Sequence, residues 1–230
     1  MLLDDLADLL LGARCPGCAR PGLLLCPDCR AGLADRPLRV EDAGALPAGL
    51  ECWSAGVHEG ALREMVSAHK DRGSWLLAGV LGAQLAVAAS PLLPRDGAVV
   101  LVPLPSSPRA VRERGYDHAR ALARAASVRL PGRPRVLPAL RRGTSVADQA
   151  GLGRGQRAAN QRGSMTARPV RPPGRAILVD DVCTTGASLA EARRSLLAAG
   201  WEVLGAAVVA QRTKSLHISP RTPEIRSEQR

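Results

Sequence analysis

One stretch constrains the fold of this chain more than any other: residues 175–189, Arg-Ala-Ile-Leu-Val-Asp-Asp-Val-Cys-Thr-Thr-Gly-Ala-Ser-Leu. Its unbroken apolar run, residues 176–179, is typical of a central parallel strand that is buried on both faces. Two adjacent carboxylates, Asp180 and Asp181, follow this run, and a turn of small residues comes next. The sequence therefore predicts a strand that delivers an acidic pair and a short turn to one edge of a sheet.

A helix is predicted after this turn, because leucines and alanines recur with a helical period as far as Gly200, the expected C′ residue. Ser188 and Glu191 have the spacing of a capping box, which would bring backbone N–H groups of the turn to a helix N-terminus. Such amides bind phosphate, and carboxylates above a strand accept hydrogen bonds from ribose hydroxyls or hold Mg²⁺. The pattern suits a phosphorylated sugar, although strand–turn–helix units occur in every α/β domain and an acidic pair there can simply be solvated.

Four cysteines near the N-terminus form two Cys-x2-Cys pairs: Cys15, Cys18, Cys26 and Cys29. This spacing predicts a structural zinc site with four thiolate ligands, which would close the coordination sphere and leave no position for catalysis. Two disulfides are the alternative, and a cytoplasmic location disfavours them. Zinc knuckles also bind nucleic acid in many proteins, so this knuckle either binds nucleic acid or only fastens the terminus.

Composition gives the expected location and the charge of the partner. The first residues are amphipathic and acidic, unlike the basic start of a signal peptide, and no apolar run is long enough to span a membrane, so a cytoplasmic protein is expected. The net charge is +11, and the stretch 109–175 holds 16 arginines against three acidic residues. This clustering favours a polyanion, either diphosphate or nucleic acid. The chain has three Trp, one Tyr and no Phe, which argues against binding of single strands by stacking.

The alternation of strands and helices predicts an α/β fold with an open parallel sheet flanked by helices. Besides the central strand, strands are expected at 51–57, 98–103, 136–140 and 203–209. The segment 143–164 is rich in Gly, Arg and Gln and is predicted to be a long mobile loop, whose position before the central strand suggests a function. Lys70 is expected at a solvated helix C-terminus, where a cation is favourable anyway. The chain divides into a helix and zinc knuckle (1–36), a linker (37–50), the α/β domain (51–212) and a disordered tail (213–230).

The run Asp-Asp-Val-x-Thr-Thr-Gly-x-Ser resembles the phosphoribosyl pyrophosphate (PRPP) signature of the type I phosphoribosyltransferases. Together with the four-Cys knuckle, two further segments resemble the ComF/GntX proteins, which are competence protein F homologues. These segments are Val-Pro-Leu-Pro…Arg-x-Arg-Gly-Tyr-Asp and Asp-Gln-Ala-x-Leu…Arg-x-x-Asn. The resemblance covers roughly residues 15–211. That family more often has Arg-Gly-Phe-Asn-Gln where this chain has Tyr116, Asp117 and His118, so a role that needs an amide at position 117 is in doubt.

The resemblance implies the type I phosphoribosyltransferase fold and a role for each matching residue. Asp180 and Asp181 would bind the ribose hydroxyls, and with Arg114 they are the catalytic candidates. The 5′-phosphate would be wrapped by Thr184, Thr185, Gly186, Ala187 and Ser188. The pyrophosphate would be contacted by Arg112, Arg114 and Gly115. A flexible loop over the reacting centre would contribute Gln149, Arg157 and Asn160.

The resemblance implies that the protein binds PRPP with Mg²⁺, or a nucleoside phosphate. If it is an enzyme, it would transfer phosphoribose to an unknown acceptor. The resemblance also implies a role in DNA uptake. The alternative is a nucleic-acid-binding module of the DNA-uptake machinery, in which the arginines and the zinc knuckle hold single-stranded DNA. The sugar-phosphate site would then be non-catalytic. The intact acidic pair and Thr-Thr-Gly turn argue against a vestigial site.

Overall fold

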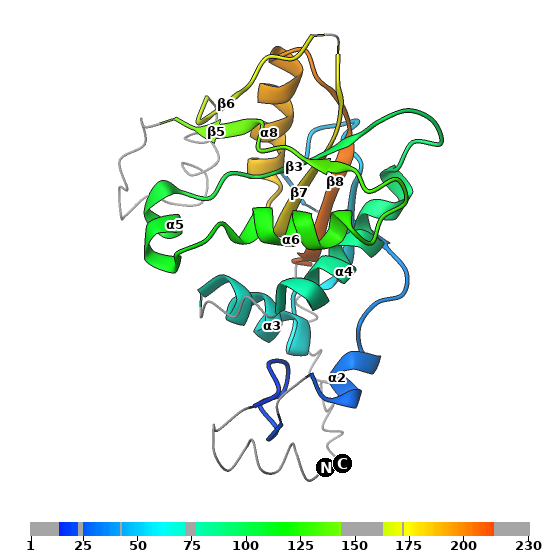
Figure 1. Ribbon diagram of the computed structural model, residues 1–230, viewed down its shortest axis with the longest axis vertical. Helices are drawn as coiled ribbons and strands as arrows, with labels where there is room; N and C mark the ends of the chain where they lie inside the picture. Colours follow the sequence, from blue (N-terminus) through cyan, green and yellow to red (C-terminus); the bar gives the residue numbers. More distant parts are fainter. Residues whose placement is uncertain are drawn as a thin grey trace, which may run out of the picture.

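The computed structural model describes residues 14–22, 25–41, 43–71, 77–143, 163–171 and 173–213. Within these residues, six strands form one sheet in the order β1-β2-β8-β7-β3-β4 (Figure 1). All neighbouring strands are parallel except β1, which is antiparallel to β2. Their bounds are β1 Leu38–Arg39, β2 Cys52–Val57, β3 Val100–Pro103, β4 Arg135–Val136, β7 Arg175–Cys183 and β8 Glu202–Gln211. The predicted open parallel sheet is confirmed, apart from the antiparallel edge strand β1.

Helices cover both faces of the sheet. On one face lie α3 (Gly60–Asp71), α4 (Leu77–Ala89) and α6 (His118–Ser127), with the short helix η1 (Ser90–Leu92) after α4. On the other face lies α8 (Ala187–Ala198), beside a small antiparallel hairpin of β5 (Leu140–Arg142) and β6 (Met165–Ala167). Of two short helices, α2 (Pro27–Ala31) lies in the cysteine-rich N-terminal segment and α5 (Pro108–Arg114) follows β3. In the part of the chain that the structure describes, no helix has the length and apolar character needed to cross a membrane.

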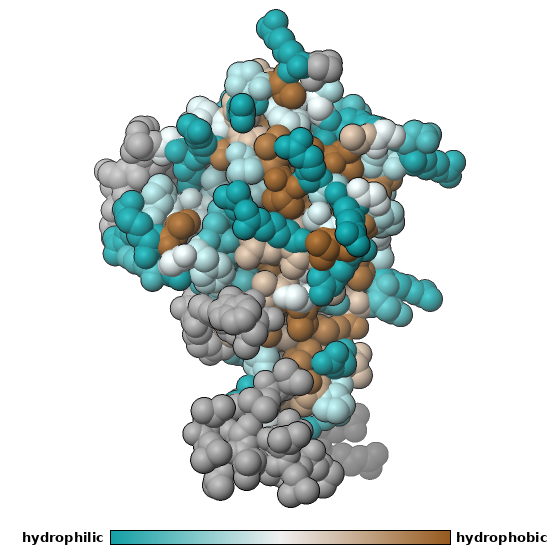
Figure 2. Space-filling view, viewed as in Figure 1, coloured by the Kyte–Doolittle hydropathy of each residue, from teal (hydrophilic) through white to brown (hydrophobic). Residues whose placement is uncertain are grey.

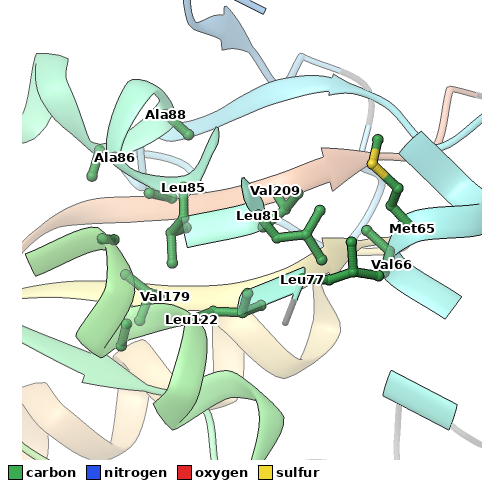
Figure 3. Close-up of a cluster of buried hydrophobic side chains, with 14 of the residues drawn as sticks. Met65, Val66, Leu77, Leu81, Leu85, Ala86, Ala88, Leu122, Val179 and Val209 are labelled. Carbon is green, nitrogen blue, oxygen red and sulfur yellow. The ribbon is translucent and has the colours of Figure 1, made fainter. Parts of the chain in front are cut away.

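The central strand is buried on both faces, as its unbroken apolar run predicts. Ile177 and Val179 belong to the apolar cluster under α4 and α6, whereas Ala176 and Leu178 belong to the cluster under α8. Figure 3 shows the first cluster, where leucines of α4 and α6 meet Val179 of β7. Because successive side chains of a strand point to opposite faces, only a run without polar residues can serve two apolar layers.

Two sequence expectations need correction or comment. The single strand expected at 136–140 is wrong: Val136 belongs to the main sheet and Leu140 to the hairpin, with Pro138 between them. Proline has no N–H for a strand ladder, which explains the break. The segment 37–50, expected to be a linker, contains strand β1 and places Val40, Ala43 and Leu50 in the cluster under α8.

The connections between strands mark the position of a site. From β7 the chain passes through α8 on one face to β8, whereas from β3 it passes through α6 on the other face to β4. The neighbouring strands β3 and β7 therefore send their connections to opposite sides, which makes their carboxyl ends a topological switch point. Ligands of open α/β sheets bind at such points. There, the backbone N–H of Leu104 donates to the carbonyl of Val179 at 2.9 Å, so the loop after β3 begins beside the acidic pair.

Candidate functional site

A cleft of about 350 Å³ lies at the carboxyl ends of β3 and β7. Its walls come from the end of α3, the loop after β3 with α5, the start of α6, the end of β5, and β7 with its turn. The polar and charged lining residues are Lys70, Ser106, Ser107, Arg114, His118, Arg142, Asp180, Asp181, Thr184 and Ser188. The structure thus brings five of the candidate residues together: Arg114, Asp180, Asp181, Thr184 and Ser188.

The acidic pair lies inside strand β7 and not after it, because β7 continues to Cys183. Each carboxylate folds back onto the main chain: Oδ1 of Asp180 accepts from the N–H of Asp181 at 2.9 Å, and Oδ1 of Asp181 accepts from the N–H of Val182 at 2.8 Å. The side chain of Asp181 is only 5% exposed, and its Oδ2 lies 2.9 Å from Nζ of Lys70 and 3.3 Å from Nε2 of His118. Asp181 is therefore a buried carboxylate that is paired with Lys70 and lies beside His118, and not a solvated strand end.

The two carboxyl groups have opposite pKa shifts. Burial, together with the negative charge of Asp181, raises the pKa of Asp180 well above its usual range. Burial also acts to raise the pKa of Asp181, but the hydrogen bond with His118 and the charge of Lys70 outweigh it and lower this pKa. The ligand-free cleft thus favours one ionised carboxylate, Asp181, beside one carboxyl group that resists ionisation.

Lys70 and His118 are site residues that the sequence analysis did not assign. Lys70 lies in the last turn of helix α3, where the hydroxyl of Tyr116 donates to the carbonyl of the preceding residue, His69, and the rings of Tyr116 and His69 are 5.5 Å apart. His118 begins helix α6 directly after its N-cap, Asp117, whose carboxylate accepts from the N–H of Arg120. The sequence contained one indication of a role for Lys70: the chain uses arginine for nearly all its basic residues, and its only other lysine is in the tail.

The turn that precedes α8 has a conformation that requires glycine. Gly186 has φ +80°, and a Cβ at this position would lie 2.6 Å from Cγ of Leu46. Segment 37–50 also contacts Thr185, the residue before Gly186, because the N–H of Ala45 donates to the carbonyl of Thr185 at 2.8 Å. The absence of a side chain at Gly186 therefore leaves space for Leu46. This packing explains why the position is glycine, and no bound ligand is needed for the explanation.

The predicted capping box is wrong. The N-cap of α8 is Gly186, so Ser188 lies inside the first helical turn. Glu191 is buried and serves the hairpin, because its Oε1 accepts from the N–H of Met165 at 3.1 Å and it pairs with Arg194 at 2.8 Å. Gly200 follows the helix with φ +85° as predicted, and a Schellman pair of hydrogen bonds joins residues 201 and 200 to the carbonyls of residues 196 and 197.

The structure separates the arginines that were expected near a pyrophosphate. Arg114 lines the cleft, whereas Arg112 is exposed on the same helix and Gly115 is the left-handed C-cap of α5; neither lines the cleft. Arg142, which no motif indicated, lines the cleft and donates to the carbonyl of Pro105 at 3.1 Å. Three further candidates, Gln149, Arg157 and Asn160, lie outside the described residues.

The four cysteines of the knuckle come together as a zinc site would require. The sulfur atoms of Cys15, Cys18, Cys26 and Cys29 lie within 4.8 Å of one another, and those of Cys18 and Cys26 are 3.6 Å apart. Four sulfurs at 2.3 Å from one zinc ion would be separated by about 3.8 Å, so the cluster fits a tetrahedral site. None of these cysteines is in a disulfide.

The surroundings of Cys15 favour a thiolate, whereas burial raises the pKa of the Cys29 thiol. Burial acts to raise the pKa of Cys15, but backbone N–H groups outweigh it and lower this pKa to about 6. One of these donors is the N–H of Cys26, 3.4 Å from Sγ of Cys15. A Cβ at Gly17 would lie 2.9 Å from Sγ of Cys29, so glycine leaves room for the sulfur. The donor set therefore fits Zn²⁺.

Comparison with known proteins adds little to this geometry. No family model and no curated protein matches the chain. Among solved structures, the orotate phosphoribosyltransferase of Mycobacterium tuberculosis H37Rv, in complex with Fe(III) dicitrate, is similar to it at 22% identity and a TM-score of 0.35. The similarity covers 81% of this chain and 85% of that chain. A TM-score this low supports no inference, so any functional assignment depends on the residues around the cleft.

Proposed function

We propose that the cleft binds PRPP together with Mg²⁺, or a nucleoside phosphate, and that this chain is a phosphoribosyltransferase-like protein of the ComF/GntX type. The observation that carries the proposal is the position of Asp180 and Asp181 at the topological switch point, in one cleft with Lys70 and Arg114. A sugar diphosphate has hydroxyls that need acceptors and phosphates that need cations. Both kinds of group line this cleft.

The sugar and the 5′-phosphate would be held by different elements. Asp180 and Asp181 would accept hydrogen bonds from ribose hydroxyls or hold Mg²⁺, which prefers carboxylate oxygens and would neutralise charge on the diphosphate. The 5′-phosphate would lie at the N-terminus of α8, where the backbone N–H groups of the first turn and the helix dipole favour an anion. The side chains of Thr184 and Ser188, which line the cleft, would add hydroxyl donors.

Three cations would face the diphosphate: Lys70, Arg114 and Arg142. In the enzymatic form of the proposal, the bond between ribose C1 and the diphosphate breaks while a bond from C1 to an acceptor forms. The negative charge that develops on the departing diphosphate would then be stabilised by these cations. The link to DNA uptake is part of the proposal and derives from the resemblance to ComF/GntX proteins.

A calorimetric titration with PRPP and Mg²⁺ tests the proposal, and the chain offers a matched pair of variants. Arg114→Gln should lower the affinity about tenfold or more, because a hydrogen bond to a charged group contributes about 1.5–3 kcal/mol. Arg112→Gln removes the same charge from the exposed side of the same helix and should leave the affinity unchanged. No heat of binding to the unaltered protein would contradict the proposal, and so would equal losses in the two variants.

Single-stranded DNA belongs in the same titration as a competitor, because exposed arginines favour the alternative function. Arg109, Arg124 and Arg141 are exposed on α5, α6 and β5. Figure 2 shows hydrophilic residues projecting from several parts of one face rather than from one continuous stripe. Among the described residues, the rings of Trp53, Trp201 and Tyr116 are buried or half-buried, so none offers an exposed stacking surface. Binding of DNA without binding of PRPP would establish the alternative.

A further inference from the structure

The cleft contains a set of metal-binding groups that is larger than the acidic pair. One ligand atom from each of His118, Asp180 and Asp181 lies within 4.8 Å of the others. Nε2 of His118 and Oδ2 of Asp181 are 3.3 Å apart. Two donor atoms bound to one metal ion at about 2.1 Å each, with a right angle between them, are about 3 Å apart. This nitrogen and this oxygen are thus already near the separation that a shared ion imposes.

The imidazole ring is oriented through its other nitrogen. The hydroxyl of Ser106 donates to Oδ1 of Asp117 at 3.3 Å, and its oxygen lies 3.2 Å from Nδ1 of His118. In the tautomer that leaves Nε2 unprotonated for a metal ion, the hydroxyl oxygen can accept from Nδ1–H. The guanidinium of Arg114 makes a longer contact with Nδ1, at 3.4 Å. A histidine that binds metal through one nitrogen commonly donates its other N–H to such an acceptor.

The ion-free cleft already places positive charge at this position. Nζ of Lys70 lies 2.9 Å from Oδ2 of Asp181, the same oxygen that lies 3.3 Å from Nε2 of His118. A divalent ion bound to Asp181 would compete with this ammonium group for the carboxylate. The ion would also be shared with Asp180, which lines the same cleft. The side chain of Lys70 is 37% exposed.

We propose that His118, Asp180 and Asp181 form a site for a divalent transition-metal ion such as Mn²⁺, which the protein binds before any sugar phosphate. One imidazole nitrogen and two carboxylates favour such an ion over Mg²⁺, which prefers oxygen ligands alone. Binding would release Asp181 from its ion pair with Lys70. The site does not depend on the sugar-phosphate assignment, because the ion is its only ligand.

Titration of the zinc-loaded protein with Mn²⁺ alone, followed by electron paramagnetic resonance, tests this site. One Mn²⁺ should bind per chain, and its spectrum should show magnetic coupling to an imidazole nitrogen. His118→Gln should remove that coupling and weaken Mn²⁺ binding about tenfold or more. The matched control is His58→Gln, which removes an imidazole outside this set of ligands and should change neither result.

Two further variants separate the site from a general disturbance of the cleft. Lys70→Met removes the competing ammonium group and should tighten Mn²⁺ binding, whereas Ser106→Ala keeps every ligand and should weaken binding about tenfold by releasing the ring. Bound Mn²⁺ without nitrogen coupling would overturn the proposal, as would an affinity that His118→Gln leaves unchanged or equal affinities for Mn²⁺ and Mg²⁺. Because no sugar phosphate is present, failure of PRPP to bind would leave these results intact.

Discussion

Replacing the two neighbouring aspartates one at a time should shift stability in opposite directions. Asparagine has nearly the shape of aspartate, and its carbonyl oxygen can still accept the backbone hydrogen bonds that each Oδ1 accepts here. The substitutions therefore change mainly charge. Asp181→Asn should destabilise the ligand-free protein at neutral pH, whereas Asp180→Asn should stabilise it.

The magnitudes follow from the contacts. Unit charges 2.9 Å apart, the distance from Lys70 to Asp181, attract by about 6 kcal/mol at an effective dielectric constant of 20. Since Lys70 regains water when the pair is lost, the net cost of Asp181→Asn should be about 2–3 kcal/mol. Two carboxylates with oxygens within 4.8 Å repel by about 3 kcal/mol or more when both are ionised. Protonation of Asp180 relieves part of this repulsion, so Asp180→Asn should gain about 1–3 kcal/mol.

Thermal unfolding at pH 7 measures both effects, at about 2–4 °C per kcal/mol for a chain of this size. The folded-state pKa of Asp181 is lowered, so its contribution is present above the ordinary aspartate pKa and is lost as pH falls through the folded pKa. The folded-state pKa of Asp180 is raised, so its penalty grows as pH rises above the ordinary value. The gain from Asp180→Asn should therefore shrink between pH 7 and pH 4. Shifts of the same sign in the two variants would refute the reasoning.

Three other predictions concern the knuckle, the charge and the turn. The purified protein should carry one Zn²⁺, and Cys18→Ser should lose it and melt earlier; metal-free protein with unchanged melting would contradict this. If single-stranded DNA is a partner, the affinity of the protein for it should fall steeply as the salt concentration rises. An affinity that does not change with salt would leave binding of diphosphate as the explanation for the clustered arginines. Gly186→Ala should cost about 2 kcal/mol or more in unfolding free energy, from its positive φ and the contact with Leu46. Adding Leu46→Ala should recover part of that loss, and no recovery would mean that the contact is unimportant.

Local patterns in the sequence were sufficient for some of these features and misleading for others. The run 176–179 could be placed in a central strand because burial on both faces excludes polar residues from it. Ser188 and Glu191, by contrast, have capping-box spacing, but the helix begins at Ala187, two residues earlier than this spacing predicts. What decides the outcome is tertiary: Leu46 fits against the bare face of Gly186, and the hairpin binds Glu191 through the N–H of Met165.

The cationic side of the site could not be predicted for a related reason. Lys70 and His118 come from two different helices and meet Asp181 only because the sheet order brings α3, α6 and β7 to one edge. A lysine at a helix C-terminus is favourable wherever the helix ends, so its position alone carries no sign of a partner. The acidic pair was recognisable because it is continuous in sequence, whereas Lys70 and His118 are brought to it only by the fold.

Helix α3 connects the two sites that the sequence treats as separate. At its start, Ala61 packs near Gly17 of the knuckle, and Cys15 and Cys29 share an apolar cluster with Met65 of the same helix. At its end, Lys70 reaches the buried carboxylate of Asp181. An α-helix rises about 1.5 Å per residue, so the two contacts are about 14 Å apart along one rigid element. The four-cysteine cluster and the cleft therefore contact opposite ends of the same helix.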